Sequence, residues 1–486
     1  MNFSTIIYER TKRGESTNRF EENVEDFLIK LFKDVLVEER WASEISDLKS
    51  ATREMMERFI IEAFEFTDDY NNEILKKCLK PVGSMEDGTS ICKPDEFDFI
   101  FEIPYPGFEA KPSTNPTTLY FPTSKCPRLV VKPCDVRFRR LFQNQAEVQS
   151  TSFLQHFCMK FTKAVAALSK TEPVKRGNYR LQMLDPSDDH CSSGFQGPAF
   201  HLHNHLVWIS PSGHEHFVSI DLVPVVVLQD EELCRQVPKF DQNDENDCEH
   251  ELPTKYYLIP MKSRSIHSTV VVAFDGEDNE MMKDFALSNF TISFADYENS
   301  IMKQWKSEIS AYHNWYICYT LMKCFGTIDH TCSNYVNIGE SGTVSLSISG
   351  VVSIPERNES LSSYAWKLLI FEQAKIYDGL QLSLYECFVS IISMFKSSNL
   401  ISIPAFTINS FWCQEVTETV YLLQQNTSDQ RTEMVDKMTD MVDKMTELNT
   451  LIQEIYQDKA YTYHVYRNKL VTIFPELKEA LSSTER

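Results

Sequence analysis

The sequence predicts an α+β protein, in which a region of mixed helices and strands is followed by a mainly helical region. Three observations predict this class. Apolar residues between residues 18 and 41 recur at intervals of three and four, as on one face of a helix. Aromatic and β-branched runs such as residues 96–103 are typical of strands. From residue 281 onward the spacing of apolar residues is again mainly helical.

In chain order, helices are expected at residues 18–41 and 52–79, and the second ends before Pro81 and Gly83. Strands are expected at residues 96–103, 129–132, 200–209, 217–228 and 256–259. The turn signal Pro211-Ser-Gly213 predicts that the third and fourth of these strands form a hairpin. Residues 229–252 are rich in Asp, Glu, Gln and Asn and are expected to be a solvated loop. Amphipathic helices are expected around residues 302–325, 361–377 and 380–395.

The C-terminal region contains a direct repeat, Met434-Val-Asp-Lys-Met-Thr-Asp followed by Met441-Val-Asp-Lys-Met-Thr-Glu. Its apolar residues alternate spacings of four and three, as in the seam of a coiled coil. They are Met434, Met438, Met441, Met445, Leu448, Ile452 and Ile455. This pattern leaves two alternatives, docking on the protein's own helical region or a homodimer seam, and we favour the first slightly.

The composition restricts the class of protein. With 70 acidic and 48 basic residues the formal charge is −22, which argues against a general nucleic-acid binder. The 13 cysteines form no CxxC pair, and no apolar stretch is long enough to span a bilayer, so we expect a cytoplasmic protein in a reducing compartment, with no membrane partner. No GxGxxG is present, and the nearest approach to a P-loop, residues 83–90, has Thr89 in place of the lysine.

Three carboxylates form the candidate catalytic site. Glu96 and Asp98 are two residues apart in an expected strand, so they project from one face. Asp221 is the only charged residue of an apolar strand, which is costly without a partner. Together the three could hold Mg²⁺ ions that activate a hydroxyl and bind a leaving pyrophosphate. The alternative, about equal on spacing alone, is a solvated strand face with Asp221 paired to a buried base.

Gly83-Ser84 precedes this strand, and a glycine lets the backbone approach a phosphate while the serine donates to it. The order of these features resembles the motif of the cyclic GMP-AMP synthase (cGAS) and Mab-21 nucleotidyltransferase superfamily. The features are a helix, Gly-Ser, a loop, Glu-Phe-Asp on a strand and a later Asp on another strand. Further blocks match in order over about residues 50–410. They are Ser219-Ile-Asp221, Tyr257-Leu-Ile-Pro260, Thr291-Ile-Ser-Phe294 with Glu298, Ser362-Ser-Tyr-Ala-Trp-Lys367 and Ile403-Pro-Ala-Phe406.

The resemblance implies a bilobal nucleotidyltransferase fold, with a mixed-sheet catalytic lobe carrying long N-terminal helices and a C-terminal helical lobe. The domains expected are an N-terminal helical extension (1–50), the catalytic lobe (51–285), a helical lobe completing the pocket (286–425) and a C-terminal helical extension (426–486). The implied function is that of a cGAS-like receptor, which makes a cyclic dinucleotide messenger for innate immunity from ATP, GTP or both. A catalytically silent Mab-21-type scaffold is the alternative.

Residue by residue, the resemblance implies that Glu96, Asp98 and Asp221 bind Mg²⁺ or Mn²⁺ and are catalytic. It implies that Gly83 and Ser84 hold the triphosphate and that Lys367 neutralises phosphate. Ser293 and Glu298 match pocket positions that face the bases. From the residues alone, Lys367 would be interpreted as a surface lysine on an apolar helix.

The chain also departs from the family pattern. Thr291, Ala295, Val223 and Ser390 stand where cyclic GMP-AMP synthase has polar or stacking groups, which puts guanine use in doubt. No zinc site is expected, because His313, Cys318, Cys324, His330 and Cys332 lack the paired spacing of a structural zinc site.

The activating ligand is left unknown by the sequence. Residues 51–80 hold five basic against seven acidic residues, so DNA is disfavoured. Double-stranded RNA stays open through a local patch drawn from Arg137, Arg139, Arg140, Lys160, Lys163, Lys170, Lys175 and Arg176. A histidine cluster, His201, His203, His205, His214 and His216, is expected to consist of ordinary exposed strand residues rather than a metal site.

Overall fold

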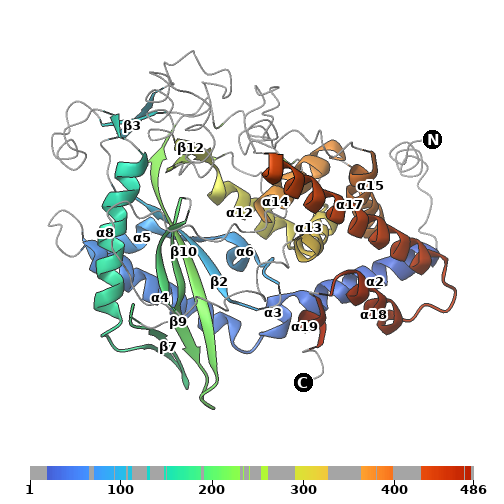
Figure 1. Ribbon diagram of the computed structural model, residues 1–486, viewed down its shortest axis with the longest axis horizontal. Coiled ribbons are helices and arrows are strands. Elements are labelled where there is room, and N and C mark those ends of the chain that lie inside the picture. The colour runs from blue at the N-terminus through green and yellow to red at the C-terminus, as the bar shows by residue number, and fades with distance from the viewer. Residues whose placement is uncertain are drawn as a thin grey trace. The chain divides into compact units, whose positions relative to one another are not determined.

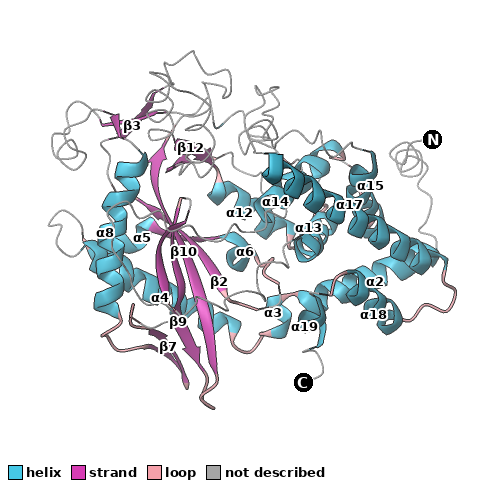
Figure 2. Cartoon of the chain, in the orientation of Figure 1, coloured by secondary structure: helices cyan, strands magenta, loops and turns pink. Residues whose placement is uncertain are grey.

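The computed structural model of the 486-residue chain divides into two compact units (Figure 1). Described residues between 36 and 313 form a unit of helices and strands, here called the sheet unit. Described residues of 19–35, 314–397 and 428–482 form a unit of helices only, the helical unit (Figure 2). The structure describes residues 19–64, 71–91, 93–104, 108–111, 128–131, 147–148, 150–187, 191–196, 198–229, 234, 240, 253–260, 290–326, 363–378, 380–397, 428–475 and 477–482.

The sheet unit is built on a nine-stranded mixed sheet in the described part of the chain. Its main path runs β1-β2-β10-β9-β7-β6, while β8 pairs with β9, and β11 joins β10 to β12. Only β2 and β10 pair in parallel among the described strands; the other pairs are antiparallel. The strands are β1 Leu79–Val82, β2 Glu96–Glu102, β6 Val174–Arg176, β7 Tyr179–Met183, β8 Ser192–Gln196, β9 Ala199–Ile209, β10 Glu215–Leu228, β11 Tyr256–Pro260 and β12 Phe290–Ser293. A separate three-stranded sheet contains β3 Phe108–Lys111, β4 Arg128–Val131 and β5 Glu147–Val148.

A core of phenylalanine rings joins the sheet to two of its helices, α4 (Ile45–Phe64) and α8 (Ser150–Leu168). Phe59 of α4 lies 5.5 Å from Phe161 of α8, measured between ring centroids, and 6.5 Å from Phe200 of β9. Phe64 lies 5.2 Å from Phe101 of β2. Because side chains alternate along a strand, the burial of Phe97, Phe99 and Phe101 turns Glu96 and Asp98 to the opposite face. Burial of these apolar rings is the main contribution to the free energy that sets which face of β2 points into the core.

The sheet unit also contains four shorter helices, α3 Val37–Arg40, α5 Asn72–Cys78, α6 Gly83–Asp87 and α12 Ala295–Trp305. The helical unit contains α2 Arg19–Val35, α13 His313–Gly326, α14 Ser363–Ile376, α15 Leu384–Ser397, α17 Ser428–Gln457, α18 Tyr463–Ile473 and α19 Leu477–Ser482. No described helix is both long enough and apolar enough to cross a membrane.

The heptad helix α17 docks within its own chain, against α2, α15 and α18. The second half of its seam, Met445, Leu448, Ile452 and Ile455, is buried there. Tyr456 contacts both Phe20 of α2 and Tyr385 of α15, with ring centroids 5.8 and 5.5 Å apart. For this half, the structure shows self-docking, which was the favoured alternative. The side chains of Met434, Met438 and Met441 lie outside the described residues.

Most expected elements are present, and the α+β class with a mixed sheet is confirmed. The hairpin of β9 and β10 is also confirmed, with Gly213 of its turn at a φ of 81°. The single helix expected at 52–79 is two helices in the described residues, α4 and α5, and the side chain of Asn71 caps the start of the second. Of the described residues in the expected span only Leu79 lies in a strand, β1, which pairs with β2 and was not predicted. Pairing with the aromatic strand β2, a tertiary contact, places residues 79–82 in the sheet. Helix α8 and the short strands β6, β7 and β8 were not predicted from the sequence.

An acid-sensitive ion-pair cluster ties α3 to α4 and to the end of α12. Glu38 bonds to the ammonium of Lys306, and a second oxygen lies 3.1 Å from Nζ of Lys49. Burial would raise the pKa of Glu38, but the two ammonium groups outweigh it and lower that pKa below its ordinary 4.5. A lowered pKa means that the cluster stabilises the fold above the ordinary value and that this contribution is lost as the pH falls through the lowered pKa.

We therefore expect Glu38→Gln to lower the free energy of unfolding by up to about 1 kcal/mol at pH 7, since the pairs are partly exposed. The difference from the wild type should shrink as the pH falls below 4.5. Urea denaturation of both proteins at several pH values measures this. A difference that stayed constant or grew in acid would contradict the assignment.

Candidate active site

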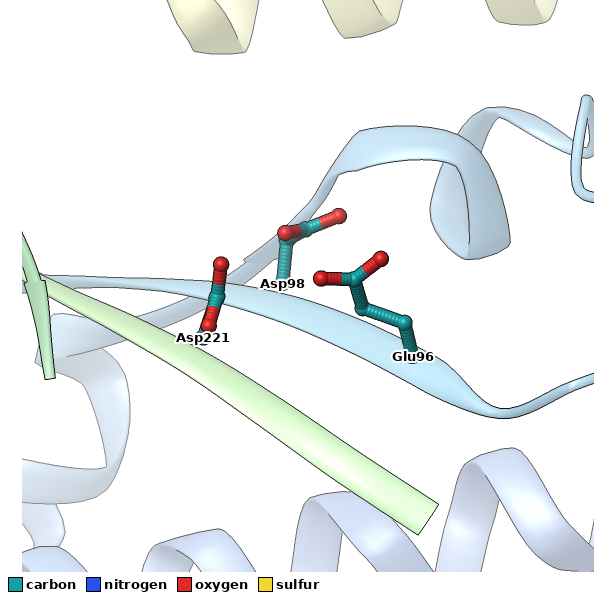
Figure 3. A group of neighbouring side chains, drawn as sticks. All are labelled: Glu96, Asp98 and Asp221. Atoms are coloured by element: carbon teal, nitrogen blue, oxygen red, sulfur yellow. The ribbon is translucent and has the colours of Figure 1, made fainter. Parts of the chain in front are cut away.

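Two adjacent parallel strands bring the three candidate carboxylates together. In the β2–β10 pair, Asp98 stands opposite Asp221, and Glu96 stands opposite Ser219. Figure 3 shows the side chains of Glu96, Asp98 and Asp221 gathered on one face of these strands. Residues far apart in the sequence thus form one cluster, because β10 returns to lie beside β2.

The cluster has the composition and spacing of a divalent-metal site. One ligand oxygen from each residue lies within 4.8 Å of the others, and among the described residues no other group of His, Cys, Asp and Glu meets this condition. Glu96 is exposed, and Asp98 and Asp221 are half-buried. Three negative charges this close repel one another unless a cation lies between them. Hard carboxylate oxygens suit Mg²⁺ or Mn²⁺, so the residues present fit such an ion.

The chain passes directly from β1 into α6, and this junction places Gly83, the first residue of α6, against Asp98. Gly83 has a φ of 74°, in the left-handed region that disfavours any residue with a side chain. A Cβ atom at this position would stand 2.7 Å from Cγ of Asp98 and would overlap its carboxylate. Glycine is therefore required here for two reasons, the backbone conformation and the space that the Asp98 carboxylate occupies.

Hydrogen bonds hold the segment after Gly83-Ser84 in place. The carbonyl of Ser84 accepts from the backbone N–H of Ser90 at 3.0 Å. Buried Asp87 accepts from both the N–H and the hydroxyl of Thr89, at 3.1 and 2.6 Å. A cavity of about 330 Å³ borders this segment and is lined by Lys49, Ser50, Arg53, Pro81, Val82, Met85, Glu86, Phe97, Asp98 and Phe99. The turn is thus a braced structure beside open space.

The histidines of β9 differ from the expectation of exposed strand residues, which is wrong for His201 and His205. Both are buried, and Nδ1 of His201 bonds to Oδ1 of Asp221. The antiparallel register of β9 and β10 shifts between Val218 and Ile220, at a bulge where Asn204 has a φ of 54°. This shift sets His201 opposite Asp221. Of the expected cluster, His216 packs on Trp41, and burial lowers its pKa.

Two expected base-facing residues lie at the junction of β12 and α12. Ser293 ends β12 and Glu298 is in the first turns of α12, and both are buried. Helix α12 packs against α6, and Lys303 of α12 pairs with Glu86 of α6. Glu298 is thus on the helix that contacts α6, which begins with Gly83-Ser84, and Ser293 lies just before that helix, within one unit.

A polar cluster fixes the start of α12 to the sheet. The hydroxyl of Tyr257 donates to Glu102 at 2.8 Å and also bonds to Asp296, and Lys255 pairs with both carboxylates. Burial, reinforced by the two carboxylates, raises the pKa of Tyr257, so its hydroxyl stays a donor. Burial opposes the charge of Lys255, but the carboxylates outweigh it and raise that pKa. This cluster was not predicted from the sequence, although Tyr257 stood in a matching block.

Lys367 belongs to α14 of the helical unit, where it is 6% exposed with its Nζ 5.8 Å from the ring centroid of Tyr319. It is therefore not the surface lysine that its helix alone would suggest. Cys318 and Cys324 are buried cysteines of α13, and burial raises the pKa of Cys318 well above its usual range. His330 and Cys332 lie outside the described residues.

Basic residues of α4 are largely engaged by carboxylates. Arg58 and Arg176 both bind Glu54, at 2.5 and 2.8 Å, and Arg53 lies 3.3 Å from Glu57. Such pairing reduces the positive field that a phosphate backbone would meet. Arg137, Arg139 and Arg140 of the expected patch lie outside the described residues.

The mixed sheet with three clustered carboxylates beside a Gly-Ser turn defines a nucleotidyltransferase-type domain. Residues 85–304 match the family model described as the Mab-21 protein nucleotidyltransferase domain. Residues 85–304 are accordingly a nucleotidyltransferase domain of the cGAS-like and Mab-21 superfamily. The match includes Glu96, Asp98, Asp221, Ser293 and Glu298 and begins two residues after Gly83. No curated protein matches the chain at a significant level.

Proposed function

We propose that the protein is a cGAS-like receptor, a metal-dependent nucleotidyltransferase that joins nucleoside triphosphates into a cyclic dinucleotide signal of innate immunity. One observation carries the proposal. Three carboxylates from two parallel strands converge within 4.8 Å, with the Gly83 backbone pressed against one of them. Three converging carboxylates repel one another, and a glycine of positive φ beside them is a strained feature. A surface with only a structural role gains nothing from this arrangement.

The roles proposed for the residues follow from their chemistry. Glu96, Asp98 and Asp221 would hold Mg²⁺ or Mn²⁺, which when bound lowers the pKa of a ribose hydroxyl and binds pyrophosphate. Gly83 and Ser84 would bind the triphosphate through backbone and hydroxyl donors. Ser293 and Glu298 would contact the bases, and Lys367 would neutralise phosphate. A second transfer on the linear product, in the same pocket, would close the ring.

A catalytically silent scaffold of the Mab-21 type is the second candidate, favoured by the altered base pocket. Val223 and Ala295, which replace polar groups of cyclic GMP-AMP synthase, pack against the apolar cluster of Ile100, Val225 and Tyr257. These positions therefore add apolar contacts where a guanine-reading enzyme has hydrogen-bonding groups. If the protein is a silent scaffold, its acidic cluster no longer takes part in catalysis. If it is an enzyme, its pocket must bind a base other than guanine at this position.

Metal and nucleotide should stabilise the sheet unit. We expect Mn²⁺ with ATP or GTP, at about a hundredfold excess over the Kd, to add about 2.7 kcal/mol and raise the unfolding midpoint by several degrees. EDTA should reverse the shift. Differential scanning fluorimetry with each triphosphate measures it, and Ca²⁺ alone serves as an ion control. An identical midpoint with and without Mn²⁺ and nucleotide would contradict the proposed site.

A further inference from the structure

His201 is bonded to one of the proposed metal ligands. It lies on β9 opposite Asp221 in the antiparallel pair, and its Nδ1 bonds to Oδ1 of that carboxylate. The imidazole side chain is 6% exposed, whereas the Asp221 side chain is 28% exposed. One oxygen of Asp221 therefore faces a buried ring, and the second stays open to the acidic cluster.

The chemistry of this bond fixes the carboxylate. An ionised carboxylate only accepts hydrogen bonds, so Nδ1 of His201 is the donor. Its Nε2 is buried and makes no hydrogen bond within the described part of the chain. The ring therefore serves Asp221 alone as a hydrogen-bond donor. A ligand held in this way presents its free oxygen in one orientation, as Mg²⁺ with its strict octahedral geometry demands.

The neighbouring residues hold the ring of His201 in its plane. His203 stacks on it, with ring centroids 5.5 Å apart and an interplanar angle of 15°. Nδ1 of His203 lies 3.2 Å from the hydroxyl of Ser219, and its Nε2 lies 3.1 Å from the side-chain amide of Asn204. The bulge at Asn204 thus has a consequence for the site, because it both sets the register of His201 and anchors the ring that stacks on it.

We propose that His201 is a positioning residue for Asp221, which orients this carboxylate for metal binding. The inference rests on the proposed function, since it assumes that Asp221 is a metal ligand. If His201 were only a packing residue, a phenyl ring of similar size would replace it without loss. If His201 positions Asp221, a smaller side chain with a hydrogen-bond donor near the former Nδ1 should preserve metal binding better than a phenyl ring does.

Titration of Mn²⁺ into the full-length protein, followed by electron paramagnetic resonance without nucleotide, separates these cases. We expect His201→Phe to weaken Mn²⁺ binding by about 10–100-fold, the usual cost of losing such a partner. His201→Asn, whose amide can donate near the former Nδ1, should come within about threefold of the wild type. His203→Phe is the matched control and should change affinity less than His201→Phe, because it retains the bond to Asp221.

Several outcomes would overturn the inference. Wild-type affinity in folded His201→Phe would do so. Equal weakening in His201→Asn and His201→Phe, with the melting temperature of His201→Asn unchanged, would do so as well. Weakening in His201→Asn beyond threefold at an unchanged melting temperature would count against it even if His201→Phe failed to fold. If the wild type itself bound no Mn²⁺, the metal site of the proposed function would fail, and that result is distinct from a difference among the histidine variants.

Discussion

Asp98→Asn or Asp221→Asn should reduce nucleotidyl transfer by about a thousandfold or more while the protein stays folded. Each change removes a charged ligand from a cluster of three within 4.8 Å. Metal stabilisation of the transition state contributes several kcal/mol, and each loss of about 1.4 kcal/mol is a tenfold loss of rate. Without metal, either variant relieves repulsion among the carboxylates, so the melting temperature should be equal to or higher than that of the wild type.

The matched control is Asp185→Asn in the same unit. Asp185 is an exposed turn residue that accepts from the N–H and the hydroxyl of Ser187, outside the acidic cluster. The Asp185→Asn variant should retain wild-type activity and lose only a little stability. Labelled triphosphates, Mg²⁺ or Mn²⁺ and thin-layer separation of products measure the rates. Full activity in either cluster variant would refute the assignment of Asp98 and Asp221 to catalysis.

Gly83→Ala should affect both stability and activity. A side chain at a φ of 74° costs about 1–2 kcal/mol in backbone strain. The added Cβ would also overlap the Asp98 carboxylate, so that either the turn or the metal ligand must move. A displacement of about 1 Å in a catalytic group can cost about a hundredfold in rate. We therefore expect a loss of activity of at least this order, measured with the wild type at equal protein concentration.

Gly213→Ala separates strain from displacement. Gly213 has a similar φ of 81° but stands in the β9–β10 turn, where an added Cβ would meet no atom within 4 Å. Urea denaturation should show the strain cost in both variants and a larger total loss in Gly83→Ala. Activity should fall only in Gly83→Ala. Equal activity in the two variants would show that the contact between Gly83 and Asp98 has no part in catalysis.

The acidic cluster could be predicted from the sequence because it depends on local rules. Alternation along a strand places Glu96 and Asp98 on one face, and a carboxylate among apolar residues marks Asp221 as needing a partner. Their meeting was implied by the family resemblance and is now seen in the parallel pairing of β2 and β10. The requirement for glycine at position 83 has a sharper cause than expected, since its missing Cβ leaves room for Asp98.

The contact between His201 and Asp221 could not be predicted in the same way. Counting back from the β9–β10 turn pairs Asp221 with His203, and the register shift at the bulge instead places His201 there. Asparagine tolerates the left-handed region, so Asn204 is compatible with a bulge but does not by itself reveal one. Similarly, β1 depends on its partner strand β2 rather than on its own residues.

The formal charge of −22 takes on a more specific meaning with the structure. At the candidate site the acidic residues are arranged as metal ligands, so their charge is part of the proposed chemistry. On α4 the basic residues are paired with carboxylates of the same region. We infer that a nucleic-acid activator would have to compete with these pairs, which weakens any such binding to α4.

A product assay decides between an active enzyme and a silent scaffold. Wild-type protein and Asp98→Asn are incubated with four labelled triphosphates and Mn²⁺ or Mg²⁺, alone and with double-stranded RNA or DNA, and then treated with phosphatase. Label that survives phosphatase and is released by phosphodiesterase in the wild type, but not in Asp98→Asn, is the predicted result. Complete loss of label to phosphatase in every wild-type reaction, in a sample whose acidic cluster binds Mn²⁺, would contradict the proposed catalysis and support the silent scaffold.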